Sequence, residues 1–335
     1  MTEKQQTVYI LLKYGVVIGL IGLFGTLFLS TGVSAYPPLG GMCFLAFTFG
    51  LRHAFDIDHI AAIDNMTRKM LHEGRKKTSI GFAFSLGHSS VVLLLTILTV
   101  CFVDWAKKAL PDFEAVGGIV GTSIAATLLL ILALANTSIL FGIWRQFKML
   151  RQGGDQKTSQ KLAEKSFVYR LFQKFLSLIH HDWQVALVGF LFGLGFDTAT
   201  QVAVLATSAT AATAGVPWYA TLSVPLFFTV GMCTLDTLDG FFMSHAYSWM
   251  IASSFRKVYF NLVMTAISVL AAAMIAGVDF VQVLHAAFGW ENSLIEHVSA
   301  LDFNQLGIVL VSLFAFSWLI ALTYWHYSGL EKVTH

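Results

Sequence analysis

Charged residues are scarce in this sequence. Asp, Glu, Lys and Arg make up 12% of its 335 residues, whereas a soluble domain typically carries about 25%. Hydrophobic residues account for 56% and aromatic residues for 14%, a composition typical of proteins that lie in a membrane. The net charge of +2 gives no sign of nucleic-acid binding, so we expect membrane lipid and no nucleic acid around the chain.

Cysteine is also rare. The three cysteines, Cys43, Cys101 and Cys233, all fall in apolar stretches, and no two of them form a Cys-x-x-Cys pair. The sequence therefore predicts neither a disulfide framework nor a structural zinc site. We expect no bound cofactor.

Long apolar runs occupy most of the chain, and about twenty apolar residues cross a bilayer as a helix. Eight runs qualify, at residues 9–33, 39–64, 78–103, 116–144, 184–209, 218–250, 257–278 and 304–327. The first is too long for the core of a signal peptide and ends without a small-residue cleavage signature, so we expect it to be retained. The predicted fold class is an all-α polytopic membrane protein with eight transmembrane helices.

Basic residues between the runs predict the orientation of the chain, because Lys and Arg favour the cytoplasmic side. The turn after the second run holds Arg68, Lys69 and the basic residues 75–77, and the 145–182 connection has eight Lys or Arg against three acids. On the opposite side, residues 279–303 contain four acids and no Lys or Arg. Both termini are therefore predicted to be cytoplasmic.

The predicted organisation is a single transporter-like domain over residues 1–335, with helices 1–4 at about 9–144 and helices 5–8 at about 184–327. The cytoplasmic loop 145–182 joins the two halves. The segments Phe47-Thr-Phe-Gly-Leu and Phe190-Leu-Phe-Gly-Leu resemble each other, and each precedes a Phe-Asp pair. Since the two helices run in opposite directions in the predicted topology, we expect an inverted repeat that relates helices 2–3 to helices 5–6.

The second run contains an unusual group of polar residues, with one Arg, two His and three Asp between positions 52 and 65. A charged group inside a bilayer costs several kcal/mol, so such a group needs polar surroundings. His53, Asp56 and His59 follow one another at intervals of three and share one side of an ideal helix. Asp58 points away and joins the same site only if the helix bends.

Other runs add further candidates. His88 follows Gly87 in the third run, Asp197 precedes Gln201 by one turn in the fifth, and Asp236 and Asp239 lie on one stripe of the sixth. Imidazole together with carboxylate favours first-row divalent ions such as Ni²⁺, Co²⁺ and Zn²⁺. The alternatives are a structural ion-pair network for the second run and interhelical hydrogen bonding for His88 and for Asn136 of the fourth run.

These motifs resemble those of the nickel/cobalt transporter family on four spans, in the same order. The matching segments are His53-Ala-Phe-Asp-Ile-Asp58-His59-Ile, Phe84-Ser-Leu-Gly-His88-Ser-Ser, Leu194-Gly-Phe-Asp-Thr-Ala-Thr and Gly231-Met with Asp236-Thr-Leu-Asp-Gly. The resemblance implies high-affinity uptake of Ni²⁺ or Co²⁺ across the bacterial cytoplasmic membrane by a secondary transporter, without an ATPase subunit. It also implies transport roles, which we transfer to the metal-site candidates His53, Asp56, Asp58, His59, His88, Asp197, Asp236 and Asp239.

Two positions depart from the family pattern. Gln201 stands where the family usually has Glu, and His245 stands where a small residue is common. Both departures leave the metal preference and any proton coupling open.

Two further functions are compatible with the residues. Efflux of the same metals is one, although related exporters carry a long His-rich loop and the 145–182 loop has only His180 and His181. A membrane metalloenzyme of the di-iron type is the other, but it requires several His boxes near the membrane surface. We therefore expect a transporter and not an enzyme.

Overall fold

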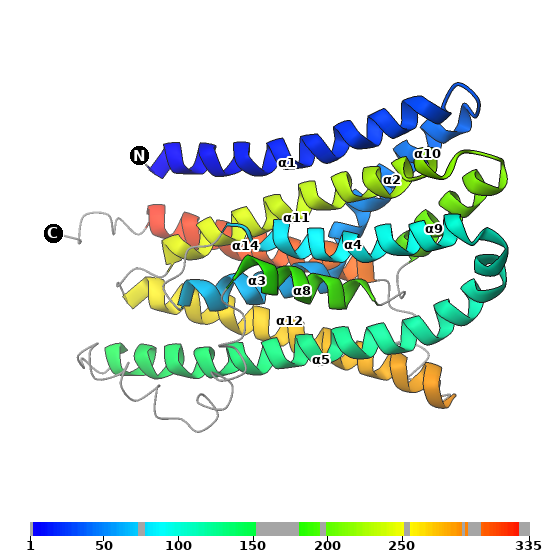
Figure 1. Ribbon diagram of the computed structural model, residues 1–335. Helices are drawn as coiled ribbons and strands as arrows, with labels where there is room; N and C mark the ends of the chain where they lie inside the picture. Colours follow the sequence, from blue (N-terminus) through cyan, green and yellow to red (C-terminus); the bar gives the residue numbers. More distant parts are fainter. Residues whose placement is uncertain are drawn as a thin grey trace.

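The computed structural model describes residues 3–72, 78–151, 181–194, 199–250, 255–289, 292–293 and 303–327. Regular structure in these ranges is helical, and they contain no β-strand. Most helices run roughly along one common direction and form an elongated bundle, with α1 along one edge (Figure 1). The prediction of an all-α protein is confirmed.

The helices of the bundle differ widely in length. They are α1 (Glu3–Gly32), α2 (Pro38–Ala54), α3 (Ile57–His72), α4 (Ile80–Cys101), α5 (Val103–Arg151), α8 (Asp182–Gly193), α9 (Ala199–Thr213), α10 (Trp218–Thr221), α11 (Ser223–Met250), α12 (Phe255–Phe288) and α14 (Phe303–Tyr327). Among the described residues, five stretches are long and apolar enough to cross a membrane: Leu12–Gly32, Ile80–Cys101, Gly118–Arg145, Trp218–His245 and Asn261–Phe288. Each of them overlaps a different one of the eight predicted spans. The membrane class is therefore confirmed, and the count of eight spans stays a prediction.

The second predicted span, 39–64, is not one continuous helix, and this expectation was wrong. The helix ends at Ala54 and a new helix begins at Ile57. Tight turns close the junction, because the Phe55 and Asp56 amides donate to the carbonyls of Arg52 and His53 at 3.1 and 2.9 Å. Gly307 of α14 packs against the Phe55 carbonyl, so a distant helix contacts the backbone where the chain bends.

The fifth predicted span, 184–209, is also divided. α8 ends at Gly193 and α9 begins at Ala199. Residues 195–198, which include Asp197, lie outside the described residues. The second predicted span thus consists of two helices divided at the Phe55-Asp56 pair, and the fifth contains α8 and α9.

Two other helices extend beyond their predicted spans. α5 begins at Val103, so the predicted connection at 104–115 is helical, and α12 continues to Phe288. Asp279, predicted in an extracytoplasmic connection, is instead fully buried within α12. α5 and α12 pack along each other, and most helical stability in proteins comes from tertiary packing of this kind.

The two divided helices pack in a reciprocal pattern. α2 packs along α11, and α8 packs along α4. Glycine allows both contacts: Gly50 lies against the Phe228 carbonyl and Gly231 against the Phe47 carbonyl. Gly87 of α4 lies in the same way against a backbone carbonyl of α8. Such close approach of helix backbones is typical of small residues in membrane bundles.

A buried amide pair joins α3 to α5. The Asn136 amide nitrogen donates to the Asn65 side-chain oxygen at 2.6 Å, and Asn65 donates to the Ala61 carbonyl at 2.7 Å. Both asparagines are fully buried. Asn136 therefore forms an interhelical hydrogen bond, which is the alternative to metal binding that the sequence suggested for it.

We expect Asn136→Leu to lower stability modestly without removing function. Interhelical hydrogen bonds in membrane proteins contribute about 0.6 kcal/mol on average, and the substitution also leaves the Asn65 amide oxygen without this donor. Thermal unfolding of the purified protein in detergent should shift down by a few degrees, by the order-of-magnitude relation between stability and midpoint. A collapse of metal transport in folded protein would instead give Asn136 a direct role.

Candidate metal centre

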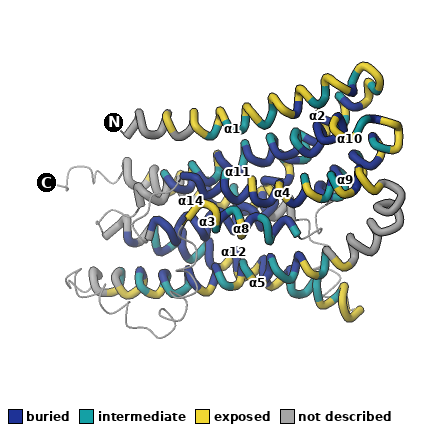
Figure 2. Tube along the Cα trace, viewed as in Figure 1, coloured by how far each residue is buried: buried dark blue, intermediate teal, exposed yellow. Residues whose placement is uncertain are grey.

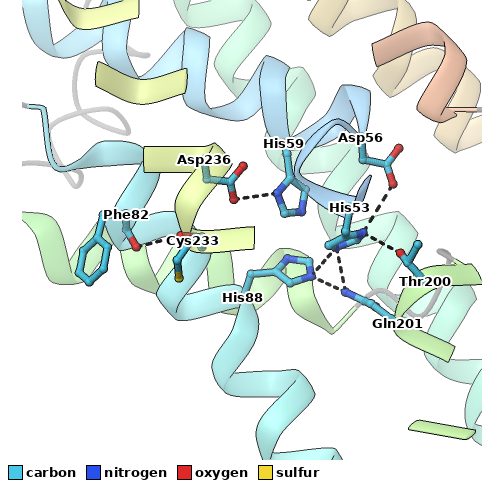
Figure 3. Close-up of polar contacts among 10 residues, drawn as sticks. His53, Asp56, His59, Phe82, His88, Thr200, Gln201, Cys233 and Asp236 are labelled. Carbon is cyan, nitrogen blue, oxygen red and sulfur yellow. Dashed lines mark hydrogen bonds and ion pairs between the residues drawn. The ribbon is translucent and has the colours of Figure 1, made fainter. Parts of the chain in front are cut away.

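Three histidines meet at the bend between α2 and α3. His53 lies in the last turn of α2, His59 in the first turns of α3, and His88 in α4. Their side chains are almost fully buried, with exposed fractions of 2, 2 and 3%. The ring centroids lie 4.6 to 4.8 Å apart, and one nitrogen from each ring lies within 4.8 Å of the others. The bend lets two helix ends and a third helix present imidazoles to one point (Figure 3).

The spacing of the ring nitrogens is compatible with a shared ion. The Nε2 atoms of His53 and His88 are 3.0 Å apart. Two imidazole nitrogens bound at about 2.1 Å to one metal ion, at an angle of about 90°, are separated by about 3.0 Å. The chemistry of the donors, neutral nitrogen beside carboxylate, suits borderline divalent ions.

A carboxylate of α11 orients His59. The Oδ2 atom of Asp236 is 3.1 Å from Nδ1 of His59 (Figure 3). Among the described residues, Nε2 of His59 has no hydrogen-bond partner. A carboxylate that accepts the Nδ1 proton leaves the Nε2 lone pair available, as in many metal-binding histidines.

His53 is held in a similar way by two groups. Its Nδ1 atom is 3.1 Å from the Thr200 hydroxyl of α9 and 3.8 Å from Oδ2 of Asp56. Because both contacts are on Nδ1, they leave Nε2 directed toward His88 and Gln201 (Figure 3).

Gln201 of α9 touches two of the three histidines. Its amide nitrogen contacts Nε2 of His88 and lies 3.4 Å from Nε2 of His53. The side chain is 1% exposed. The sequence analysis placed Gln201 one turn after Asp197 and noted it as a departure from the family pattern, but it predicted no metal-site role for Gln201 or Thr200. Thr200 is the last residue of the quoted fifth-span motif, and Gln201 follows it.

Two aromatic rings pack against the imidazoles. Phe84 packs against His59 with ring centroids 5.0 Å apart, and Phe228 packs against His53 at 5.6 Å. Both phenylalanines are fully buried. An apolar wall of this kind excludes water and strengthens electrostatic interactions at the site.

The remaining predicted site residues differ in their positions. Asp58 is buried in the first turn of α3, next to His59. Asp239 lies one turn beyond Asp236 on α11. Asp197 lies outside the described residues. The structure thus brings His53, Asp56, His59, His88 and Asp236 together and leaves the contribution of the other three as a prediction.

The comparison with known proteins identifies the family. The family model NicO, described as high-affinity nickel-transport protein, matches residues 39–324. The chain belongs to this family. All the residues of the site lie inside the matched range.

Curated relatives of the chain carry transport names. The nickel transporter NicT of Mycobacterium tuberculosis is 41% identical over 88% of this chain and 82% of its own length. The nickel transporter NixA of Staphylococcus aureus is 38% identical over 96% and 95%, and the cobalt transport protein NhlF of Rhodococcus rhodochrous is 35% identical over 93% and 90%. No solved structure matches the chain. These are transporters and not enzymes, so the metalloenzyme alternative is wrong.

A second polar network of this nickel-transport family member lies further along α3. The Arg68 guanidinium is 3.5 Å from Oδ1 of Asp64 and donates to the Thr265 hydroxyl at 2.8 Å. Ser268 donates to the other Asp64 oxygen. The network joins α3 to α12 and neutralises one buried acid with a cation of the chain itself.

Proposed function

We propose that this protein carries Ni²⁺ into the cell across the cytoplasmic membrane, with Co²⁺ as a second cargo. The observation that carries the proposal is the buried group of three imidazoles at the junction of α2, α3 and α4, oriented by carboxylates. The family match and the nickel and cobalt names of the relatives support the same cargo. The bacterial relatives support a bacterial cytoplasmic membrane as the location.

The proposed cargo site uses the predicted residues in two roles. His53, His59 and His88 supply nitrogen donors, because their nitrogens converge on one buried point. Asp56 and Asp236 orient imidazoles through Nδ1 and offset the charge of the ion. We assign Asp58, Asp197 and Asp239 to the entry and exit of the ion, since a transport path needs more polar groups than a single binding site.

We further propose eight spans with both termini in the cytoplasm and one domain over residues 1–335. In this topology α2 with α3, and α8 with α9, each count as one interrupted span. Interrupted helices in corresponding positions of two inverted halves are typical of secondary transporters that work by alternating access. The reciprocal packing of α2 on α11 and of α8 on α4 supports such a repeat.

The membrane potential favours import of the proposed cargo. A charge that crosses 100 mV gains about 2.3 kcal/mol, so a divalent cation gains about twice that when it enters a cell that is negative inside. No ATPase subunit is needed for uptake driven in this way.

Accumulation of ⁶³Ni²⁺ in cells that express the chain tests the proposal. We expect accumulation above that of cells with an empty vector, and we expect His53→Ala to return it to the vector level. Accumulation equal to the vector would overturn the importer, and accumulation below it would indicate efflux. Competition by unlabelled Co²⁺, Zn²⁺ and Mn²⁺ in the same assay measures selectivity.

A further inference from the structure

We infer that Gln201 of α9 is a fourth ligand of the cargo site and determines its selectivity, with its carbonyl oxygen as the donor atom. This inference rests on the proposed function of the three histidines as a metal site. It adds a helix, α9, and a neutral oxygen donor to the three imidazoles, which lie on α2, α3 and α4.

The hydrogen-bonding capacity of the groups around Gln201 supports this role. Neutral imidazole has one N–H donor and one lone pair, and a primary amide has two N–H donors on its nitrogen. The Nε2 atoms of His53 and His88 are 3.0 Å apart, so one of them donates to the other. The two Nε2 atoms therefore offer one N–H group and one lone pair. The Gln201 amide nitrogen, which can only donate, contacts the same two atoms. Donors therefore outnumber acceptors at this point when no cation is bound.

A cation reverses this balance. His53, His59 and His88 can each direct an Nε2 lone pair at one ion, and a half-turn of the Gln201 amide directs its carbonyl oxygen at the same place. In the described structure that oxygen, Oε1, is buried and has no hydrogen-bond partner among the described residues. If the amide turns so that its oxygen and nitrogen change places, the oxygen loses no hydrogen bond and becomes a fourth donor to the ion.

Thr200 holds the neighbouring His53 ring in the orientation that this role requires. Its hydroxyl is 3.1 Å from Nδ1 of His53, and it comes from the same helix turn as Gln201. A contact at Nδ1 fixes the ring orientation and directs Nε2 toward the Gln201 amide. α9 thus positions one nitrogen ligand and supplies one oxygen donor.

Because the Gln201 side chain is uncharged, it influences which ion the site selects. Nitrogen donors favour Ni²⁺ and Co²⁺, whereas carboxylate oxygens suit harder ions such as Mn²⁺. The carboxylates of Asp56 and Asp236 contact the Nδ1 sides of the histidines, so a neutral fourth donor keeps carboxylate oxygen off the Nε2 side. A carboxylate at position 201 would shift the site toward harder ions.

The test is Co²⁺ binding to the purified full-length protein in detergent, followed by visible absorption, because Co²⁺ spectra report the number and type of ligands. We expect Gln201→Leu to change the spectrum and to raise the Kd about tenfold, the lower range for loss of a supporting group at a metal site. Gln201→Glu should keep a four-donor spectrum and increase the ability of Mn²⁺ to displace Co²⁺. Ser208→Ala is the matched control, since Ser208 is buried on the same helix and bonds only to the Val204 carbonyl of that helix in the described contacts.

The outcomes separate this inference from the proposed function. An unchanged spectrum and Kd in Gln201→Leu, when His53→Ala abolishes binding, would overturn the role of Gln201 and leave the histidine site intact. Absence of Co²⁺ and Ni²⁺ binding by the unsubstituted protein would overturn the histidine site and this inference together. Gel filtration of each variant establishes that its protein is folded before titration.

Discussion

Cells that express His88→Ala should accumulate ⁶³Ni²⁺ no faster than cells with an empty vector. His88 is the only one of the three clustered histidines that lies on α4, and its Nε2 atom is 3.0 Å from that of His53. Alanine removes one of the three clustered nitrogen donors. We expect transport to fall by about 100-fold or more, since loss of even a group that only supports a metal ligand costs about 10- to 100-fold.

His245→Ala is the matched control for this result. His245 lies on α11, and its Nδ1 atom is 2.9 Å from the Phe241 carbonyl of the same helix. It is a partly buried histidine outside the three-imidazole group, so we expect near-normal uptake. Comparable amounts of each variant in the membrane must be shown by immunoblot. Normal uptake by His88→Ala would mean that α4 supplies no ligand.

The sequence predicted that His53 and His59 lie together, but it did not predict the geometry of α2 and α3. On a straight helix, the spacing of His53, Asp56 and His59 already placed them on one side. In the structure they come together across a bend, where Asp56 precedes the first turn of α3. An Asp at this position often begins a helix, and that local signal was available. The contact of Gly307 with the Phe55 carbonyl was not, because it joins residues about 250 positions apart.

Helix ends and interhelical contacts account for the other differences. Asp279 is buried within α12, which packs against α5, and composition alone does not reveal this packing. The same limit applies to Thr200 and Gln201. Their residue types are ordinary for a membrane helix, and only the approach of α9 to His53 and His88 shows that they belong to the site. Periodicity predicts which residues share a face, whereas the partner of that face follows from tertiary structure.

Gly50→Ala should prevent the protein from folding into its transport-competent form. An ideal Cβ at Gly50 overlaps the Phe228 carbonyl of α11 and lies 3.0 Å from the Met232 nitrogen. Both obstacles are backbone, so they cannot rotate away as a side chain would. Insertion of extra volume into a packed core costs about 1–3 kcal/mol, and more where nothing can move. Because Gly50 lies one turn before His53, any separation of α2 from α11 also displaces a proposed ligand.

Gly41→Ala separates this effect from the change in helix propensity. Gly41 lies on the same helix, and a Cβ there meets nothing within 4 Å. Alanine favours a helix over glycine by about 1 kcal/mol, so Gly41→Ala should be neutral or slightly stabilising while Gly50→Ala is strongly destabilising. Gel filtration in detergent and thermal unfolding measure both variants, and ⁶³Ni²⁺ uptake follows the same order. Equal stability of the two variants would show that α2 and α11 do not approach as closely as the glycines indicate, and the support that this contact gives to an inverted repeat would be lost.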